Sequence, residues 1–172
     1  MKPKVLTEKF YRQNTTEVAK KLLGKYLVID RKNEKNKLMI TETEAYLGEK
    51  DKASHSYSGK TERNKVMFGP PGKWYVYLIY GIHDMLNIVT EQQGTPKAVL
   101  IRAAGEFDGP GKLTKALGIN RDYNGKRANP KTGLWIEDQG TSISENKIKT
   151  TPRIGVDYAE EWAKKPLRFV LT

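Results

Sequence analysis

Two glutamates, Glu42 and Glu44, stand near the end of the run Leu38-Met-Ile-Thr-Glu-Thr-Glu-Ala-Tyr46. Side chains alternate along a β-strand, so this spacing predicts one face that carries Leu38, Ile40, Glu42, Glu44 and Tyr46. Two carboxylates about 7 Å apart at the polar end of an apolar row could act as a general acid or base. Spacing alone leaves a second reading open, in which one or both glutamates pair with nearby lysine or arginine.

The net charge indicates what kind of partner this protein attracts. The 172 residues include 31 lysines and arginines against 20 aspartates and glutamates, which gives a formal net charge of +11. Such an excess predicts attraction to polyanions with a steep dependence on salt. Charge alone fits a ribosomal or RNA-binding protein as well as an enzyme.

A tyrosine-rich run, Lys73-Trp-Tyr-Val-Tyr-Leu-Ile-Tyr-Gly81, is the second candidate for chemistry. Alternation puts Tyr75 and Tyr77 on one strand face and Trp74 and Val76 on the other. Aromatic residues in strands commonly pack in a core. In a basic protein, tyrosines that end at a glycine turn could instead stack on bases or wedge between them.

Several function classes are excluded or disfavoured by composition. The absence of cysteine excludes disulfides, thiolate metal sites, iron–sulfur clusters and cysteine nucleophiles. Neither of the two histidines, His55 and His83, has the spacing of a zinc motif, so we expect no metal and no cofactor. No apolar run approaches the roughly 18 residues that a spanning helix needs, and residues 1–10 lack the features of a secretory signal. We therefore expect no membrane contact.

The elements that must position these residues follow from capping, turn and alternation signals. Helices are predicted from Asn14 to Gly24 and over 112–117, and the polar stretch 48–72 is typical of a long functional loop. A tight connection is expected at 81–84. The predicted strands cover 25–30, 37–46, 73–80, 85–90, 98–103, 133–137 and 168–171. We predict a single α+β domain over residues 1–172, in which a curved antiparallel sheet carries the site and helices lie at its edges.

Six motifs occur in a fixed order along the chain: Glu42-Thr-Glu-Ala-Tyr-Leu-Gly48, Ala53-Ser-His-Ser56, Tyr75-Val-Tyr-Leu-Ile-Tyr-Gly81, Val99-Leu-Ile-Arg102, Gly109-Pro-Gly-Lys-Leu113 and Pro152-Arg-Ile-Gly155. In this order, and over nearly the whole length, the chain resembles the alkyladenine (3-methyladenine) DNA glycosylase family. The resemblance implies a monofunctional base excision repair enzyme without metal or cofactor. It would flip an alkylated or deaminated purine out of duplex DNA, hydrolyse the N-glycosidic bond with water and leave an abasic site.

The resemblance also implies catalytic roles for three positions. Glu44 would activate the water, while Arg102 and the main-chain carbonyl of Ile154 would hold it. A carboxylate at this place suits the chemistry, because a departing purine leaves an oxocarbenium-like sugar that a negative charge stabilises. Glu44 would have to be ionised, and we expect the nearby Arg102 to keep it so.

Other positions are implied to bind the substrate and the DNA. The residues implied to form the pocket are Tyr46, His55, Tyr77 and Asn87. Those implied to contact the DNA are Tyr80, Gly81 and Ile82. Asn87 would screen purines by their exocyclic substituent, and Tyr80 would fill the gap that the flipped nucleotide leaves.

Two other functions stay open on the residues alone. Glu42, Glu44 and Asp51 could bind Mg²⁺ in a metal-dependent nuclease, and the tyrosines could serve a non-catalytic nucleic-acid-binding protein. For the glycosylase we expect a monomer whose partner is double-stranded DNA with a damaged purine. We expect it in the cytoplasm of a bacterium, associated with the nucleoid, or in the nucleus of a eukaryote.

Overall fold

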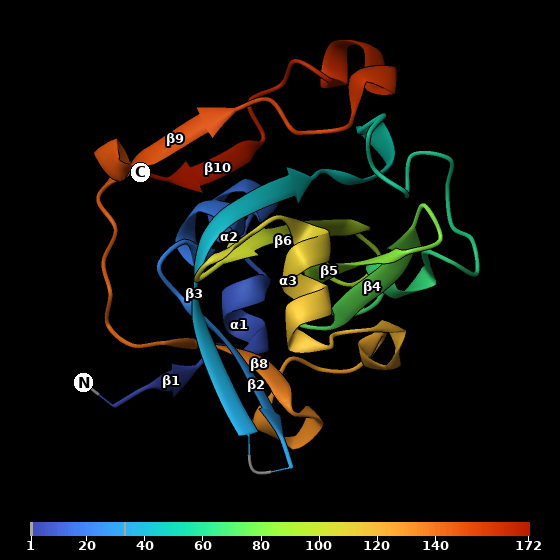
Figure 1. Cartoon of the computed structure of the whole chain (residues 1–172). Coiled ribbons are helices and arrows are strands. Elements are labelled where there is room, and N and C mark those ends of the chain that lie inside the picture. Colours follow the sequence, from blue (N-terminus) through green and yellow to red (C-terminus); the bar gives the residue numbers. More distant parts are fainter. Residues whose placement is uncertain (1, 33) are drawn as a thin grey trace.

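The longest strand, β3 (Glu34–Tyr46), joins the two parts of an antiparallel sheet in the computed structural model, which describes residues 2–32 and 34–172. The main path of the sheet runs β1-β8-β2-β3-β6-β5-β4, and β10, β9 and β7 pair beside it (Figure 1). The other strands are β1 (Lys4–Val5), β2 (Tyr26–Arg31), β4 (Trp74–Ile79), β5 (His83–Thr90), β6 (Lys97–Ala104), β7 (Phe107–Asp108), β8 (Leu134–Asp138), β9 (Ile148–Thr151) and β10 (Arg168–Leu171). All pairings are antiparallel, which confirms the predicted α+β class with its antiparallel sheet.

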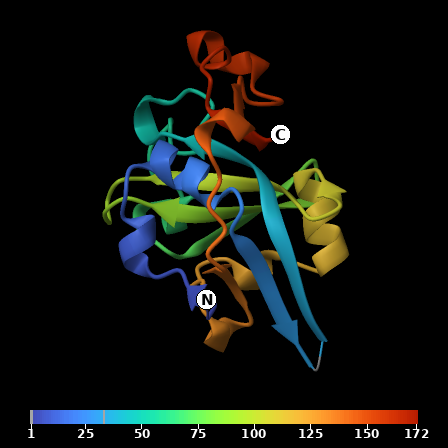
Figure 2. The same cartoon turned by 90° about the vertical axis from the view of Figure 1, so that its left-hand side faces the viewer.

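Strand β3 has different neighbours along its length. Its first half pairs with β2, and its second half lies between β6 and β10, so that Thr43 faces Ile101 on one side and Phe169 on the other. Figure 2 shows the length of the β2–β3 hairpin from the side. The end of β3 that carries the glutamates is therefore held by hydrogen bonds from both neighbours, which restricts its movement.

A β-bulge in β3 corrects one sequence prediction. The pairing with β6 shifts between Ile40 and Glu42 and again between Glu42 and Thr43. Ile40 and Ala45 both lie in the main core although an odd number of positions separates them, and Thr43 donates a hydrogen bond to Ala19 on the core side. Glu42 and the acidic end of the strand thus face away from Ile40. The prediction of one continuous face was wrong, because a bulge inserts a residue and reverses the alternation.

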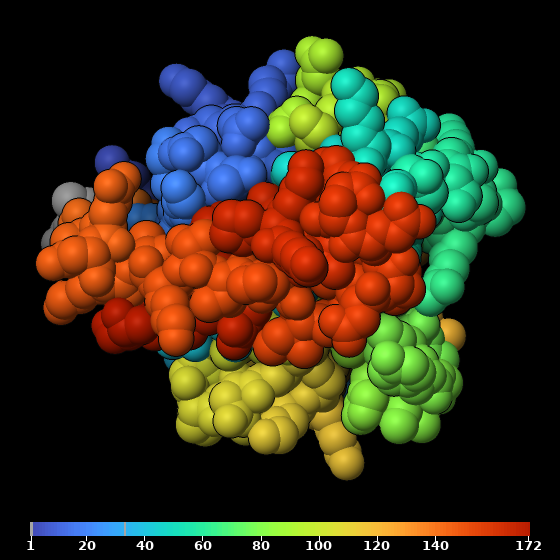
Figure 3. Space-filling view, turned by 90° about the horizontal axis from the view of Figure 1, so that it is seen from above, coloured from blue at the N-terminus to red at the C-terminus, as the bar shows by residue number. Residues whose placement is uncertain are grey.

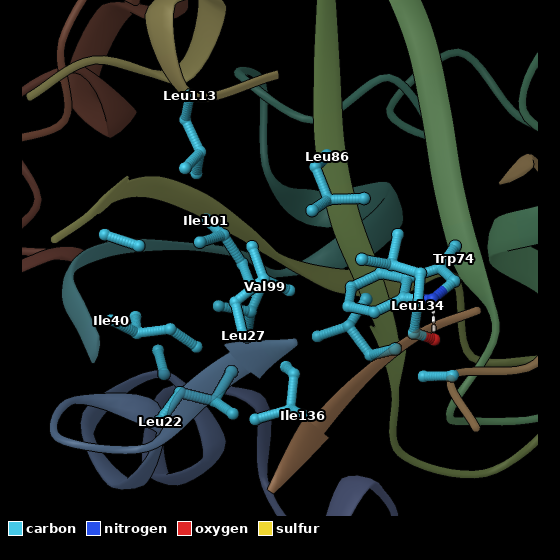
Figure 4. Packing of buried hydrophobic residues seen from close by; sticks show 14 of the residues in the cluster. Leu22, Leu27, Ile40, Trp74, Leu86, Val99, Ile101, Leu113, Leu134 and Ile136 are labelled. Carbon is cyan, nitrogen blue, oxygen red and sulfur yellow. Dashed lines mark hydrogen bonds between the residues drawn. The ribbon is translucent and has the colours of Figure 1, made fainter. Parts of the chain in front are cut away.

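The core is formed between the sheet and the helices. Figure 4 shows Trp74 against Leu134, with the indole Nε1 donating to the Leu134 carbonyl at 3.1 Å. Leu22 comes from helix α2 (Thr15–Leu22) and Leu113 from helix α3 (Pro110–Leu117). A fully buried side chain of this size contributes roughly 1.5–3 kcal/mol to folding. Packing of both helices on one core fixes the strand ends that lead to the site.

The helix boundaries follow the capping signals. Helix α2 begins after Asn14, whose Oδ1 accepts from the backbone amides of Thr16 and Glu17, as predicted from the Asn14 start. Helix α3 begins at Pro110, two residues before the prediction, and ends at Gly118 in the left-handed conformation with φ +57°. The short helix α1 (Glu8–Tyr11) was not predicted, since four residues give too little periodicity.

The C-terminal segment lies across one face of the molecule. β9 and β10 form a hairpin-like pair, and between them the chain makes a 3₁₀ turn at Asp157–Trp162. Figure 3 shows this orange and red segment in the centre of that face, with the teal loop region beside it. β9 was not predicted because Lys149, Thr150 and Thr151 give no apolar alternation. Within the ranges given above, no helix is long and apolar enough to cross a membrane.

Candidate active site

Glu44 is a fully buried carboxylate with three donors around it. Its side chain is 0% exposed, Oε1 accepts from the Ile154 amide at 2.8 Å, and Oε2 accepts from the Tyr46 hydroxyl at 2.8 Å. Nε of Arg102 lies 3.5 Å from Oε1. Burial raises the pKa of Glu44 above its ordinary value, while Arg102 and the two hydrogen bonds lower it only in part. The group is thus a stronger base than an exposed glutamate.

Two predicted site residues, Arg102 and Ile154, lie beside Glu44. We expected Arg102 to keep Glu44 ionised, and its charge does lower the pKa of Glu44, but Arg102 donates its Nε–H to Glu42 Oε1 at 2.8 Å and stands 3.5 Å from Glu44 Oε1. The amide nitrogen of Ile154 is the atom that contacts Glu44, and the role of the Ile154 carbonyl toward a water molecule stays a prediction. Neither contact could be read from spacing, because the first depends on how β6 meets β3 and the second on how the C-terminal segment meets β3.

A cavity of about 210 Å³ opens in front of Glu44. Its wall is mostly apolar and aromatic, which is typical of ligand pockets. The predicted site residues that line it are Tyr46, His55, Tyr77, Tyr80, Asn87, Arg102 and Ile154. Glu44 lies directly behind this wall, since Tyr46 and Ile154 both bond to it. Pro110 lines the cavity as well, so the structure brings all six motifs to it.

Three rings of the aromatic wall, those of His55, Tyr75 and Tyr77, pack against one another. The rings of His55 and Tyr77 have centroids 4.2 Å apart, and those of Tyr75 and Tyr77 are 5.3 Å apart. Nδ1 of His55 and the Tyr75 hydroxyl are 2.9 Å apart. Burial, with a smaller contribution from the positive charge of Arg63, lowers the pKa of His55 to about 4, so this histidine is neutral at pH 7. Tyr75 and Tyr77 lie on the side opposite Trp74 and the main core, as alternation predicted.

Asn87 is a buried amide in the strand next to these rings. It is 3% exposed, and its Nδ2 donates to the carbonyls of Tyr75 at 3.1 Å and Met85 at 3.3 Å. Because both neighbours are acceptors, the orientation of the amide is fixed with nitrogen toward the backbone. Its oxygen is thereby available to a group in the cavity.

Tyr80 lies at the tip of the β4–β5 hairpin and, at 82%, is more exposed than any other large apolar residue within the described ranges. Tyr80 and Gly81 have φ of +52° and +69°, and the Ile82 amide donates to the Ile79 carbonyl. Positive φ at two successive positions is the requirement of a type I′ turn, and it is unfavourable for a tyrosine by about 1–2 kcal/mol. The turn covers residues 80–82 rather than the predicted 81–84. Gly81 and Ile82 lie at this tip, outside the cavity lining.

An ion pair close to the cavity was not predicted from the sequence. Arg153 and Asp51 are both 0% exposed and make two hydrogen bonds, Nη1 to Oδ2 at 2.6 Å and Nη2 to Oδ1 at 2.8 Å. Asp51 also accepts from the amides of Leu47 and Ala53, and the guanidinium lies 4.7 Å from the Tyr46 ring centroid. Arg153 belongs to a quoted motif, but nothing in the sequence identified its partner. The pair joins the C-terminal segment to the loop after β3.

Tyr158 is a second lining residue that sequence reasoning missed. It is 69% exposed, borders the cavity, and its hydroxyl lies 3.4 Å from the Ala53 carbonyl. It comes from the 3₁₀ turn that the C-terminal segment places over the loop. In the sequence, only the aromatic side chain of Tyr158 could have indicated a role, because the residue belongs to no helix or strand pattern.

The three carboxylates of the nuclease alternative are separated by their partners. Glu42 bonds to Arg102 and Arg168, and Asp51 is enclosed with Arg153. Among residues 2–32 and 34–172, no three histidine, cysteine, aspartate or glutamate side chains are grouped as metal ligands would be. The geometry of these carboxylates instead favours charge pairing with arginine.

Comparison with known proteins relates the chain to one family. The family model described as "Methylpurine-DNA glycosylase (MPG)" matches residues 9–108 and 104–172. A protein of Methanocella arvoryzae, named "Putative 3-methyladenine DNA glycosylase", is 46% identical over 185 residues, which cover 96% of this chain and 91% of the relative. Proteins with the same name occur in Myxococcus xanthus, 44% identical over 95% of this chain and 88% of the relative, and in Legionella pneumophila, 46% identical over 96% and 93%.

Proposed function

The chain belongs to the methylpurine-DNA glycosylase family, and from this premise we propose that it removes alkylated or deaminated purines from duplex DNA. The base is flipped into the aromatic cavity, water hydrolyses its N-glycosidic bond, and an abasic site remains. The observation that carries this proposal is the buried Glu44 directly behind a wall of aromatic rings. The enzyme acts in DNA repair as a monomer in the compartment that holds the DNA.

Glu44 is the general base of the reaction. Its ionised form takes a proton from water as the purine departs, and its negative charge stabilises the oxocarbenium-like sugar. Arg102 and the carbonyl of Ile154 hold the water, a role that the Ile154 amide supports by orienting the carboxylate. A raised pKa suits a base, because a carboxylate with ordinary acidity takes up a proton poorly.

The aromatic wall binds the flipped base. Tyr46, His55 and Tyr77 offer ring faces to which any purine can stack, so the base range is broad. A purine that carries a positive charge after alkylation gains cation–π attraction to the tyrosines. His55 is uncharged at pH 7, as its pKa of about 4 implies, and so does not repel such a base.

Asn87 selects among purines, and Tyr80 helps to open the base stack. The fixed amide of Asn87 places its oxygen where it tests the exocyclic substituent of a purine. Tyr80 projects from the hairpin tip and fills the gap in the base stack, with Gly81 and Ile82 against the strand beside it. A wedge of this kind offsets part of the few kcal/mol that unstacking a nucleotide requires.

Release of free base from a duplex with one hypoxanthine or ethenoadenine, in EDTA, tests the proposal. Wild type and the Glu49→Gln control, whose glutamate is exposed just after the end of β3, are expected to release the base, while Glu44→Gln releases none. Retained release by Glu44→Gln would show that the catalytic assignment is wrong. Activity that vanishes in EDTA would favour the metal-dependent alternative, and tight binding without release of any damaged base would favour the binding module.

A borohydride test addresses the monofunctional mechanism. A lysine amine that attacked the sugar would form an imine, which borohydride traps as a covalent protein–DNA adduct. Water as the nucleophile gives no adduct while base release continues. A trapped adduct would replace hydrolysis by a lyase mechanism but leave the glycosylase assignment intact.

A further inference from the structure

Glu42 connects Arg102 to a second arginine, Arg168. A single oxygen, Glu42 Oε1, accepts from Arg102 Nε at 2.8 Å and from Arg168 Nε at 2.6 Å. The three side chains are largely enclosed, with exposed fractions of 12% for Glu42, 13% for Arg102 and 22% for Arg168. One carboxylate shared by two guanidinium groups leaves one positive charge in excess beside Glu44.

The same nitrogen of Arg102 lies near both glutamates. It is 2.8 Å from Glu42 Oε1 and 3.5 Å from Glu44 Oε1. A charged hydrogen bond has a normal length of about 2.7–2.9 Å, so the Nε–H of Arg102 is directed at Glu42 and only approaches Glu44. Without Glu42, this N–H would be free to close the remaining gap to Glu44.

The backbone makes this arrangement specific. Arg168 is paired in the β10–β3 ladder with Glu44, yet its side chain reaches diagonally to Glu42 and donates Nη1 to Thr151 at 3.1 Å. The bulge in β3 sets Glu42 opposite Ala103, next to Arg102 on β6. Three strands, β3, β6 and β10, thus each contribute one member of the cluster.

We propose that Glu42 is a positioning residue that, together with Arg168, holds Arg102 away from Glu44. This keeps Glu44 basic enough to take a proton from water and leaves the end of Arg102 on the cavity side. In the described part of the chain, neither Nη group of Arg102 donates to a protein acceptor, and Arg102 lines the cavity. The inference rests on the proposed function of Glu44.

Several groups act on Glu44 besides this cluster. They are Tyr46 on β3, Tyr77 on β4, and Arg153, the Ile154 amide and Tyr158 on the C-terminal segment. Substitution of Glu42 removes one negative neighbour and releases Arg102, and both changes favour the ionised form of Glu44. Substitution of Arg168 removes a positive neighbour and leaves Glu42 wholly to Arg102, which favours the protonated form.

The test is the single-turnover rate of base release from a hypoxanthine duplex as a function of pH. In Glu42→Gln, we expect the acidic limb to move down by about one pH unit and the plateau rate to fall about tenfold, with lesion affinity kept. In Arg168→Gln, the limb should move up. Glu137→Gln is the matched control, because Glu137 is a comparably buried carboxylate on β8, outside the cavity lining, and pairs with Lys37.

The outcomes separate this inference from the proposed function. Opposite shifts in the two variants, with no shift in Glu137→Gln, support the positioning role. A wild-type profile and rate in Glu42→Gln, beside an inactive Glu44→Gln, overturn the inference alone. Loss of rate that only follows a loss of thermal stability, without a pH shift, also overturns it. An active Glu44→Gln would remove the proposed function and this inference with it.

Discussion

Arg153 and Asp51 form a bidentate ion pair between two fully buried side chains. Its hydrogen bonds of 2.6 and 2.8 Å join the C-terminal segment to the loop after β3. Arg153 also donates to the Ala45 carbonyl at 2.9 Å. The pair therefore holds the two chain segments that bring Ile154 and Tyr46 to Glu44. Its integrity decides whether the cavity keeps its shape.

Removal of one partner should be strongly destabilising. Arg153→Met leaves the buried charge of Asp51 without its partner, and we expect a loss of about 3–5 kcal/mol in the free energy of unfolding. Urea denaturation measures it, with Lys52→Met as a control whose exposed pairing to Glu160 and Glu161 should hardly change the midpoint. An Arg153→Met midpoint equal to that of the control would contradict an enclosed pair.

Loss of the Glu44 charge should stabilise the fold at neutral pH. A raised pKa means that the folded chain binds this proton more tightly than the unfolded chain, so stability falls as pH rises from the ordinary glutamate pKa through the raised one. Glu44→Gln removes that penalty, and we expect its Tm at pH 7.5 to exceed the wild-type value by about 2–4 °C. The gain should disappear at low pH, where Glu44 is protonated. A lower Tm for the variant at pH 7.5 would show that the charge is well solvated or fully compensated.

The pH dependence of base release should report Glu44 rather than His55. Activity is expected to fall on the acidic side at a pH above the ordinary glutamate pKa of 4.5, because burial raises the pKa of Glu44. His55 has a pKa of about 4 and stays neutral across this limb. His55→Gln should therefore lower lesion affinity but leave the midpoint of the limb in place. A midpoint that moved with this substitution would assign the limb to His55.

Substitution of Tyr80 should raise the stability of the fold but weaken the binding of damaged DNA. Tyr80→Gly relieves a positive φ and removes a side chain that is 82% exposed, so we expect the unfolding free energy to rise by about 1 kcal/mol. Affinity for a lesion duplex should fall at least tenfold, since nothing then fills the gap in the stack. Binding titrations check this, with Tyr57→Ala as a control at an exposed tyrosine outside the cavity. Equal affinities of the two variants would argue against a wedge.

Local patterns predicted much of the fold. The Asn14 cap and the glycine at position 118 located two helices within a few residues, and alternation placed Tyr75 and Tyr77 opposite the core. Short elements such as β9 escaped, because four residues without apolar alternation carry no signal. The bulge in β3 was not predicted for another reason: an inserted residue changes the strand pairing without changing the local sequence pattern.

The sequence by itself determined the types of residue that could act, the order of the motifs and, through them, the resemblance to a glycosylase family. Tertiary structure alone decided which charges meet. Asp51 and Arg153 are 102 positions apart, and Glu42 and Arg168 are 126 positions apart. Contacts at such separations depend on strand register and on the path of the C-terminal segment, which no local periodicity encodes. Because of the same register, the Glu44 side chain points away from Ile40 and is buried, and this burial raises the pKa of Glu44.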